Sequence, residues 1–172
     1  MVLRTAPLFA AFVACGLATA GLAQSAGDLT LVIAGEERTI PVWPGQSDWS
    51  GGESWPSINI YARDFDDEGM EPVVVSLSFE ASRWEPSMPE MELSLYENRE
   101  LLRKLYAREE EERGGLTVTL DSHAIDGTTL STSGSFEGTL GHSDNHGRDI
   151  DLSAGVPVTG SFNVTLEELN MD

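Results

Sequence analysis

The C-terminal third of the chain contains nearly the same stretch twice. The two copies are Thr-Ser-Gly-Ser-Phe-Glu-Gly-Thr-Leu at 132–140 and Val-Thr-Gly-Ser-Phe-Asn-Val-Thr-Leu at 158–166. Apolar and polar residues alternate in both copies, which is typical of a half-buried β-strand. A glycine lies two residues before each phenylalanine and shares its face, a place that suits a bulge or the close approach of another backbone. We therefore predict two neighbouring antiparallel strands, joined by a polar loop at 141–154.

The same alternation extends through most of the chain, with turns rich in Gly, Pro and Asp between the segments. This pattern predicts a mainly β protein, a single-domain antiparallel β-sandwich or flattened barrel over residues 24–172. The alternating segments are 29–33, 38–42, 58–63, 73–80, 93–95 and 116–120. The first two form a predicted hairpin, in which Pro41 indicates an edge strand. Their inward phase predicts a core of Leu31, Ile33, Ile58, Ile60, Val73, Val75, Leu77, Phe79, Leu93, Leu95, Leu116, Val118, Leu120, Phe136, Leu140, Phe162, Val164 and Leu166.

Residues 98–113 break the alternation and are rich in Leu, Arg, Lys and Glu. Their leucines fall on one helical face together with Tyr106, Asn98 is a suitable N-terminal cap, and Gly114 is a suitable stop. We expect one short helix here. The acidic run 109–112 opposes this interpretation, because the helix dipole disfavours anions near a C-terminus. The alternative is a strand that runs into a charged turn.

The first residues resemble a targeting segment. Arg4 is followed by an almost wholly apolar stretch at 7–22, and small residues precede Gln24. This order predicts a bacterial-type signal peptide at 1–23 and an exported protein, periplasmic or secreted. In the alternative interpretation Cys15 is a lipidated first residue, and the protein carries a lipid anchor.

The composition limits the partners. Cys15 is the only cysteine, so the mature chain has no disulfide and no thiolate metal site. Acidic residues number 29 against 10 basic ones, for a net charge of −19. Such a surface repels nucleic acid and anionic membranes, and we expect neither as a partner. We also expect no transmembrane segment in the mature chain. The charge favours cationic partners or divalent ions, or it serves solubility alone.

Three tryptophans, Trp43, Trp49 and Trp55, lie close together in a segment rich in Gly and Pro. Tryptophan is costly to expose, so three of them in one loop need an explanation. One hypothesis is an aromatic platform that binds a sugar ring or a partner protein. The other is that the rings fold inward and close one end of the sandwich.

An acidic segment between two predicted strands resembles the first half of a calcium loop. Asp64, Asp66 and Glu68 supply oxygen ligands at relative positions 1, 3 and 5, and Gly69 occupies position 6. The twelfth position should be a bidentate acid and is Val75. The alternative is therefore a solvated, metal-free hairpin tip.

The loop between the two repeated strands is the densest cluster of ligand-type side chains. Its candidate metal ligands are His142, Asp144, His146, Asp149 and Asp151. Imidazoles suit Zn²⁺ and carboxylates suit Ca²⁺, although the spacing matches no specific template. The same residue types also build ordinary long turns.

The sequence contains no nucleophile elbow, phosphate loop or dinucleotide fingerprint. Our leading hypothesis is an exported β-sandwich that acts without catalysis, as a binding or structural module of the cell envelope with a protein or glycan partner. The first alternative is a calcium-stabilised carbohydrate-binding module, with Ca²⁺ as its only cofactor. The second is a secreted hydrolase that uses a carboxylate pair, for which an abundance of acids is no evidence by itself.

Overall fold

The protein is described here by a computed structural model, which covers residues 25–64, 73–97 and 100–169. In these ranges the chain is almost entirely β-strand, with one 3₁₀ turn and no α-helix. The elements are β1 (Gly27–Ile33), β2 (Glu36–Pro41), β3 (Asp48–Ser50), β4 (Ser57–Arg63), β5 (Val73–Ser82), β6 (Glu85–Glu97), β7 (Glu100–Arg108), η1 (Glu111–Arg113), β8 (Thr117–Asp126), β9 (Thr129–His142) and β10 (Asp151–Glu168).

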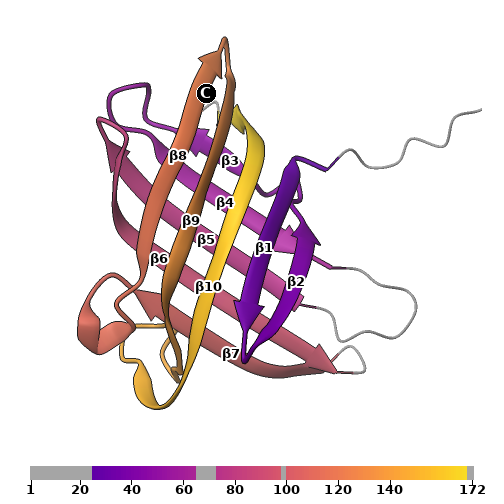
Figure 1. The fold of residues 1–172 in the computed structure, drawn as a ribbon, viewed down its shortest axis with the longest axis vertical. Helices are drawn as coiled ribbons and strands as arrows, with labels where there is room; N and C mark the ends of the chain where they lie inside the picture. The colour runs from indigo at the N-terminus through magenta and orange to yellow at the C-terminus, as the bar shows by residue number, and fades with distance from the viewer. Residues whose placement is uncertain (1–24, 65–72, 98–99, 170–172) are drawn as a thin grey trace, which may run out of the picture.

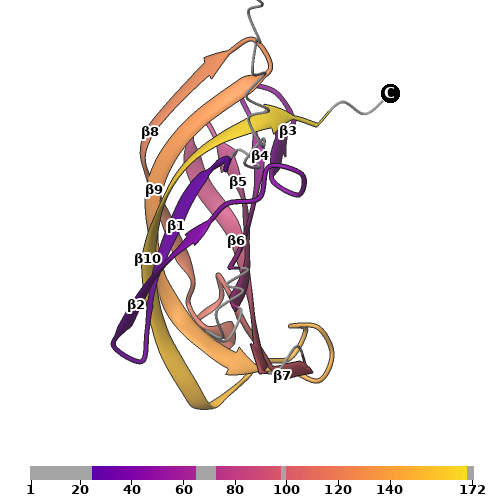
Figure 2. The same ribbon diagram turned by 90° about the vertical axis from the view of Figure 1, so that its right-hand side faces the viewer.

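The strands form two layers that face each other (Figures 1 and 2). One layer contains β2, β1, β10, β9 and β8 in that order, and the other contains β3 to β7 in chain order. The layers are joined at both sides, because β10 pairs with β3 and β9 pairs with β7. Every pairing is antiparallel except the short one between β10 and β3. The predicted mainly β, sandwich-like fold is confirmed.

The core lies between the layers and follows the predicted phase. Alternate residues of β5 are buried along its whole length, which is the period expected of a strand with one inward face. Phe79 from one layer approaches Phe162 from the other, with ring centroids 6.0 Å apart. Fourteen of the predicted core residues are buried, and the remaining four are partly buried against the same cluster, namely Ile33, Leu95, Val118 and Leu120.

The predicted hairpin at the N-terminal side is also confirmed. β1 and β2 pair antiparallel around Ala34 and Gly35, which have φ values of 52° and 82°. Two positive φ angles in a two-residue loop match the right-handed twist of the flanking strands. β2 is the outer strand of its layer, so Pro41, which lacks an N–H, lies on an edge strand as predicted.

The repeated sequence forms a pair of neighbouring antiparallel strands, β9 and β10, as predicted. Ser135 lies opposite Ser161, and on either side of this pair a glycine lies opposite a phenylalanine. A Cβ atom built on Gly134 would come within 2.7 Å of the Phe162 ring, and one on Gly160 would meet the Phe136 ring. Each aromatic ring thus covers the glycine of the other strand, which explains the spacing of the repeat.

The predicted helix at 98–113 is wrong. Residues 100–108 form β7, which pairs with β6 and is followed by the 3₁₀ turn η1. The apolar residues do not share one environment, since Leu105 is buried whereas Leu101 and Leu102 are exposed. The strand alternative is therefore correct. No helix in the described ranges is long and apolar enough to cross a membrane.

Candidate functional site

The structure separates the three tryptophans. Trp49 belongs to the core, with 2% of its surface exposed, and its indole N–H donates a hydrogen bond to the carbonyl oxygen of Thr128 at 3.0 Å. Trp49 therefore joins β3 to the β8–β9 turn, in the inward position that one of the two hypotheses describes.

The other two tryptophans have different surroundings. Trp43 is half-buried beneath the guanidinium of Arg63, whose central carbon lies 3.2 Å from a ring centroid of the indole. Burial lowers the pKa of Arg63. Trp55 is 53% exposed, and its indole N–H donates to Glu80 Oε2 at 2.6 Å. Of the three rings, Trp55 alone is broadly exposed to solvent.

The acidic segment after β4 is described only at its first ligand position. The backbone N–H of Asp64 donates to the carbonyl oxygen of Val73 at 3.1 Å, which continues the β4–β5 pairing by one step. Asp66 and Glu68 lie outside the described residues.

In the loop after β9, polar side chains form hydrogen bonds within the loop itself. Asn145 Nδ2 donates to Asp149 Oδ2 at 2.6 Å, and the backbone N–H of Asp149 donates to Asn145 Oδ1 at 2.9 Å. His142 Nε2 lies 2.9 Å from Asp144 Oδ1 on an exposed part of the loop. His146 has a φ of 60°, which is the left-handed conformation that tight turns require.

Asp151 stands at the end of this loop, where β10 begins. Its Oδ1 accepts the backbone N–H of Ser153 at 2.8 Å. Hydrogen bonds from the Ser153 hydroxyl and from this N–H, with a smaller contribution from His142, lower the pKa of Asp151. A hollow of about 390 Å³ lies between the two flanks of the loop. Within the described part of the chain, no three His, Cys, Asp or Glu side chains converge on a point that could hold a metal ion.

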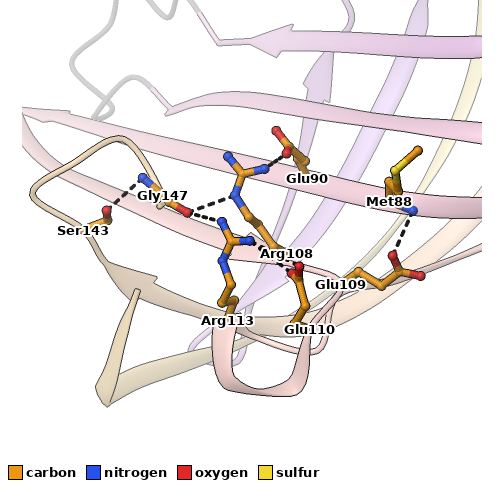
Figure 3. Close-up of polar contacts among 8 residues, drawn as sticks. All are labelled: Met88, Glu90, Arg108, Glu109, Glu110, Arg113, Ser143 and Gly147. Atoms are coloured by element: carbon orange, nitrogen blue, oxygen red, sulfur yellow. Dashed lines mark hydrogen bonds and ion pairs between the residues drawn. The ribbon is translucent and has the colours of Figure 1, made fainter. Parts of the chain in front are cut away.

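Two arginines that the sequence analysis did not single out fix the position of this loop (Figure 3). Arg108 Nε and Arg113 Nη2 both donate to the carbonyl oxygen of Gly147, at 2.9 and 2.6 Å. Arg108 also forms an ion pair with Glu90. Burial, and then the nearby Arg113 cation, lower the pKa of Arg108. From the other side, Ser143 Oγ accepts the N–H of Gly147 at 2.8 Å.

The outer face of the β2–β1–β10–β9–β8 layer presents a different kind of surface. One residue from each strand contributes a hydroxyl group, and the strand register aligns all five across the layer. This set, the hydroxyl row, runs in the order Thr39, Thr30, Ser161, Ser135 and Thr119. Thr30 is half-buried and the others are exposed.

The adjacent outward row lies two residues away from the hydroxyl row on each strand. It contains Glu37, Val32, Thr159, Glu137 and Thr117 in the same strand order. A hollow of about 480 Å³ lies over the two rows and is lined by members of both. We call the two rows together the hydroxyl face.

Two pairs of hydroxyl groups on this outer face lie within hydrogen-bond distance. The side-chain oxygens of Thr30 and Thr39 lie 3.1 Å apart, and those of Ser122 and Ser133, further along the same outer face, lie 2.7 Å apart. Cross-strand pairs of this kind stabilise a sheet. The hydroxyl row itself carries no charge, in a chain whose net charge is −19.

The hydroxyl face was not predicted from the sequence. The outward phase of each strand was readable, but the row depends on which strands are neighbours and in which register. No family model, curated protein or solved structure matches this chain significantly. Its function therefore has to be argued from its own geometry.

Proposed function

We propose that the protein is an exported binding module of the cell envelope, which engages its ligand through the hydroxyl face. The observation that carries this proposal is the alignment of five hydroxyl side chains across the layer, four of which line a hollow of about 480 Å³. The proposed export rests on the signal-like residues 1–23.

The shape of the site supports binding to an extended ligand. The hollow is open, and its floor is formed by paired strands that hold each side chain at a fixed spacing. Serine and threonine have short side chains and lose little conformational entropy when a ligand orders them. The face can therefore bind without rearranging, and a rigid sheet is a suitable support for a binding surface.

The proposal is tested by adsorption of the exported, purified protein to insoluble envelope material from the organism that produces it. Ser135→Arg places a large charged side chain in the centre of the hydroxyl row and should abolish adsorption. Ser76→Arg is the matched control, because Ser76 lies on the outer face of the opposite layer, between Tyr61 and Glu92. Both variants add one positive charge, so a general change in charge affects them equally.

Adsorption of the wild type and of Ser76→Arg, together with loss of adsorption in Ser135→Arg, supports the proposal. Equal adsorption of both variants contradicts it, and so does a wild-type protein that stays entirely in solution. Circular dichroism and the melting temperature of each variant confirm that the fold is retained.

A further inference from the structure

The geometry points to a neutral polysaccharide as the ligand of the hydroxyl face, an inference that rests on the proposed function. The hydroxyl row crosses five strands. Adjacent strands lie about 4.8 Å apart, so the row is about 19 Å long. A site of this length with regular spacing is suited to an extended polymer that crosses the strands, rather than to a small compact molecule.

The chemistry of the row matches a polyol. Each serine or threonine hydroxyl both donates and accepts hydrogen bonds, as each sugar hydroxyl does. Thr30 and Thr39 already exchange a hydrogen bond across the strands at 3.1 Å. A sugar hydroxyl can join such a pair without leaving a buried donor or acceptor unsatisfied, which is the main cost of polar recognition.

The charges around the row select against anionic polymers. Glu37 and Glu137 lie in the neighbouring row, on either side of Val32 and Thr159, and no cation lies in either row. The net charge of −19 adds a long-range repulsion of anions. Acidic polysaccharides, nucleic acids and anionic lipid surfaces are therefore disfavoured, whereas a neutral glycan experiences no repulsion.

The apolar content of the two rows is too small to hold a protein or a lipid by burial. Val32 is the only aliphatic side chain among the ten outward residues of the two rows. Stable protein interfaces contain a fully buried apolar centre, which these rows lack. Hydrogen bonding to a hydroxyl-rich chain is the interaction that this surface provides.

Affinity electrophoresis of the exported protein tests the inference. The native gels contain one soluble polymer each: the neutral polymers dextran, mannan and mixed-linkage β-glucan, or the anionic polymers alginate and carboxymethylcellulose. At least one neutral polymer should retard the wild type, and the retardation should persist in 0.5 M NaCl, because no ion pair is involved. Neither anionic polymer should retard it at low salt.

The double variant Thr30→Val with Thr119→Val isolates the hydroxyl groups, since valine keeps the branched shape that suits a strand. Loss of two hydrogen bonds should weaken the affinity about tenfold. The matched control is Ser76→Ala, which removes a hydroxyl from the opposite layer and should bind as the wild type does.

The outcomes separate this inference from the proposed function. If envelope adsorption depends on Ser135 but no neutral polymer retards the protein, the neutral polysaccharide is rejected as the ligand. The hydroxyl face is then still supported as the binding site. Retardation by the anionic polymers alone also overturns the ligand class, as does wild-type affinity in the double valine variant. If envelope adsorption itself fails, the proposed function falls.

Discussion

Gly160 shows at the residue scale how the repeated sequence determines packing. A Cβ atom at this position would meet the ring of Phe136 and the backbone oxygen of Thr30. A backbone oxygen in a paired strand gives way less easily than a side chain. Gly160→Ala should therefore lower the free energy of unfolding by about 1–3 kcal/mol, as overpacked interiors do. Denaturant titration measures this change.

The control is Gly45→Ala. A Cβ atom on Gly45 meets only the Trp43 side chain, at 3.0 Å. Its effect on the free energy of unfolding should stay within about 0.5 kcal/mol. In a background of Phe136→Leu, the loss caused by Gly160→Ala should shrink, because the two residues are in contact and their effects are coupled. Equal losses for Gly160→Ala and Gly45→Ala would contradict the close approach.

Asp151 predicts a dependence of stability on pH. Its pKa is lowered from the ordinary value of 3.8 by the hydrogen bonds from Ser153. A carboxyl whose pKa is lower in the folded state stabilises the fold above its unfolded pKa, and this contribution is lost as the pH falls through the folded pKa. Asp151→Asn should therefore melt at a lower temperature than the wild type at pH 7, and this difference should shrink as the pH falls below 3.8 and be lost below the folded pKa.

Melting curves of the wild type and Asp151→Asn between pH 2 and 7 measure this difference. Asp121→Asn is the control, since Asp121 is exposed and no hydrogen bond or ion pair of its side chain is found among the described residues. A difference between wild type and Asp151→Asn that is constant with pH would contradict the role of the Asp151 charge.

At the scale of an element, the loop after β9 is held by contacts with β7 and with the 3₁₀ turn η1. Arg113 donates to the carbonyl oxygen of Gly147 at 2.6 Å, and Arg108 donates to the same atom. Arg113→Ala should cost about 1 kcal/mol of stability, because Arg108 remains as a donor to that oxygen. Amide hydrogen exchange in residues 143–150 should become faster, since local opening requires less free energy.

Arg148→Ala is the matched control, because Arg148 is an exposed cation of the same loop. It should leave the exchange rates of the loop unchanged. Faster exchange in both variants would show that the net charge of the loop, and not the contact with Gly147, determines its opening.

Residues 98–113 show why the secondary structure of a segment can be predicted wrongly from its sequence. The leucines fit one helical face, and the acidic run was the only opposing signal. The structure instead pairs β7 with β6, so that Leu105 enters the core and Leu101 and Leu102 stay exposed. Tertiary pairing outweighs local propensity here, because every residue of β7 except Leu102, which lies at a break in the register, has a partner in β6.

At the scale of the whole molecule, the sequence predicts the layered fold. It does not predict the surface that strands far apart in the sequence form together. Alternation fixes the inward phase of each strand independently, so every residue that it predicts for the core lies in the core or against it, whereas core residues such as Leu105 of the misassigned β7 were not predicted. The hydroxyl row required that β1 pair with β10 and that β8 pair with β9, in one particular register each. No local sequence pattern encodes which of the ten strands are neighbours. The hydroxyl row could therefore not be predicted without the strand order and register.

The net charge of −19 leads to a prediction for the whole molecule. Folding brings the acidic side chains closer together, and their mutual repulsion opposes the compact state. Salt screens this repulsion, since the Debye length falls from about 30 Å at 0.01 M to about 3 Å at 1 M. At pH 7 the melting temperature should rise by several degrees between 0.01 and 0.5 M NaCl. At pH 4.2, close to the isoelectric point, the net charge is near zero and the rise should vanish.

Scanning calorimetry at both pH values measures the effect. An equal rise at pH 7 and at pH 4.2 would assign it to preferential exclusion of salt from the protein surface, and not to the charge of the fold.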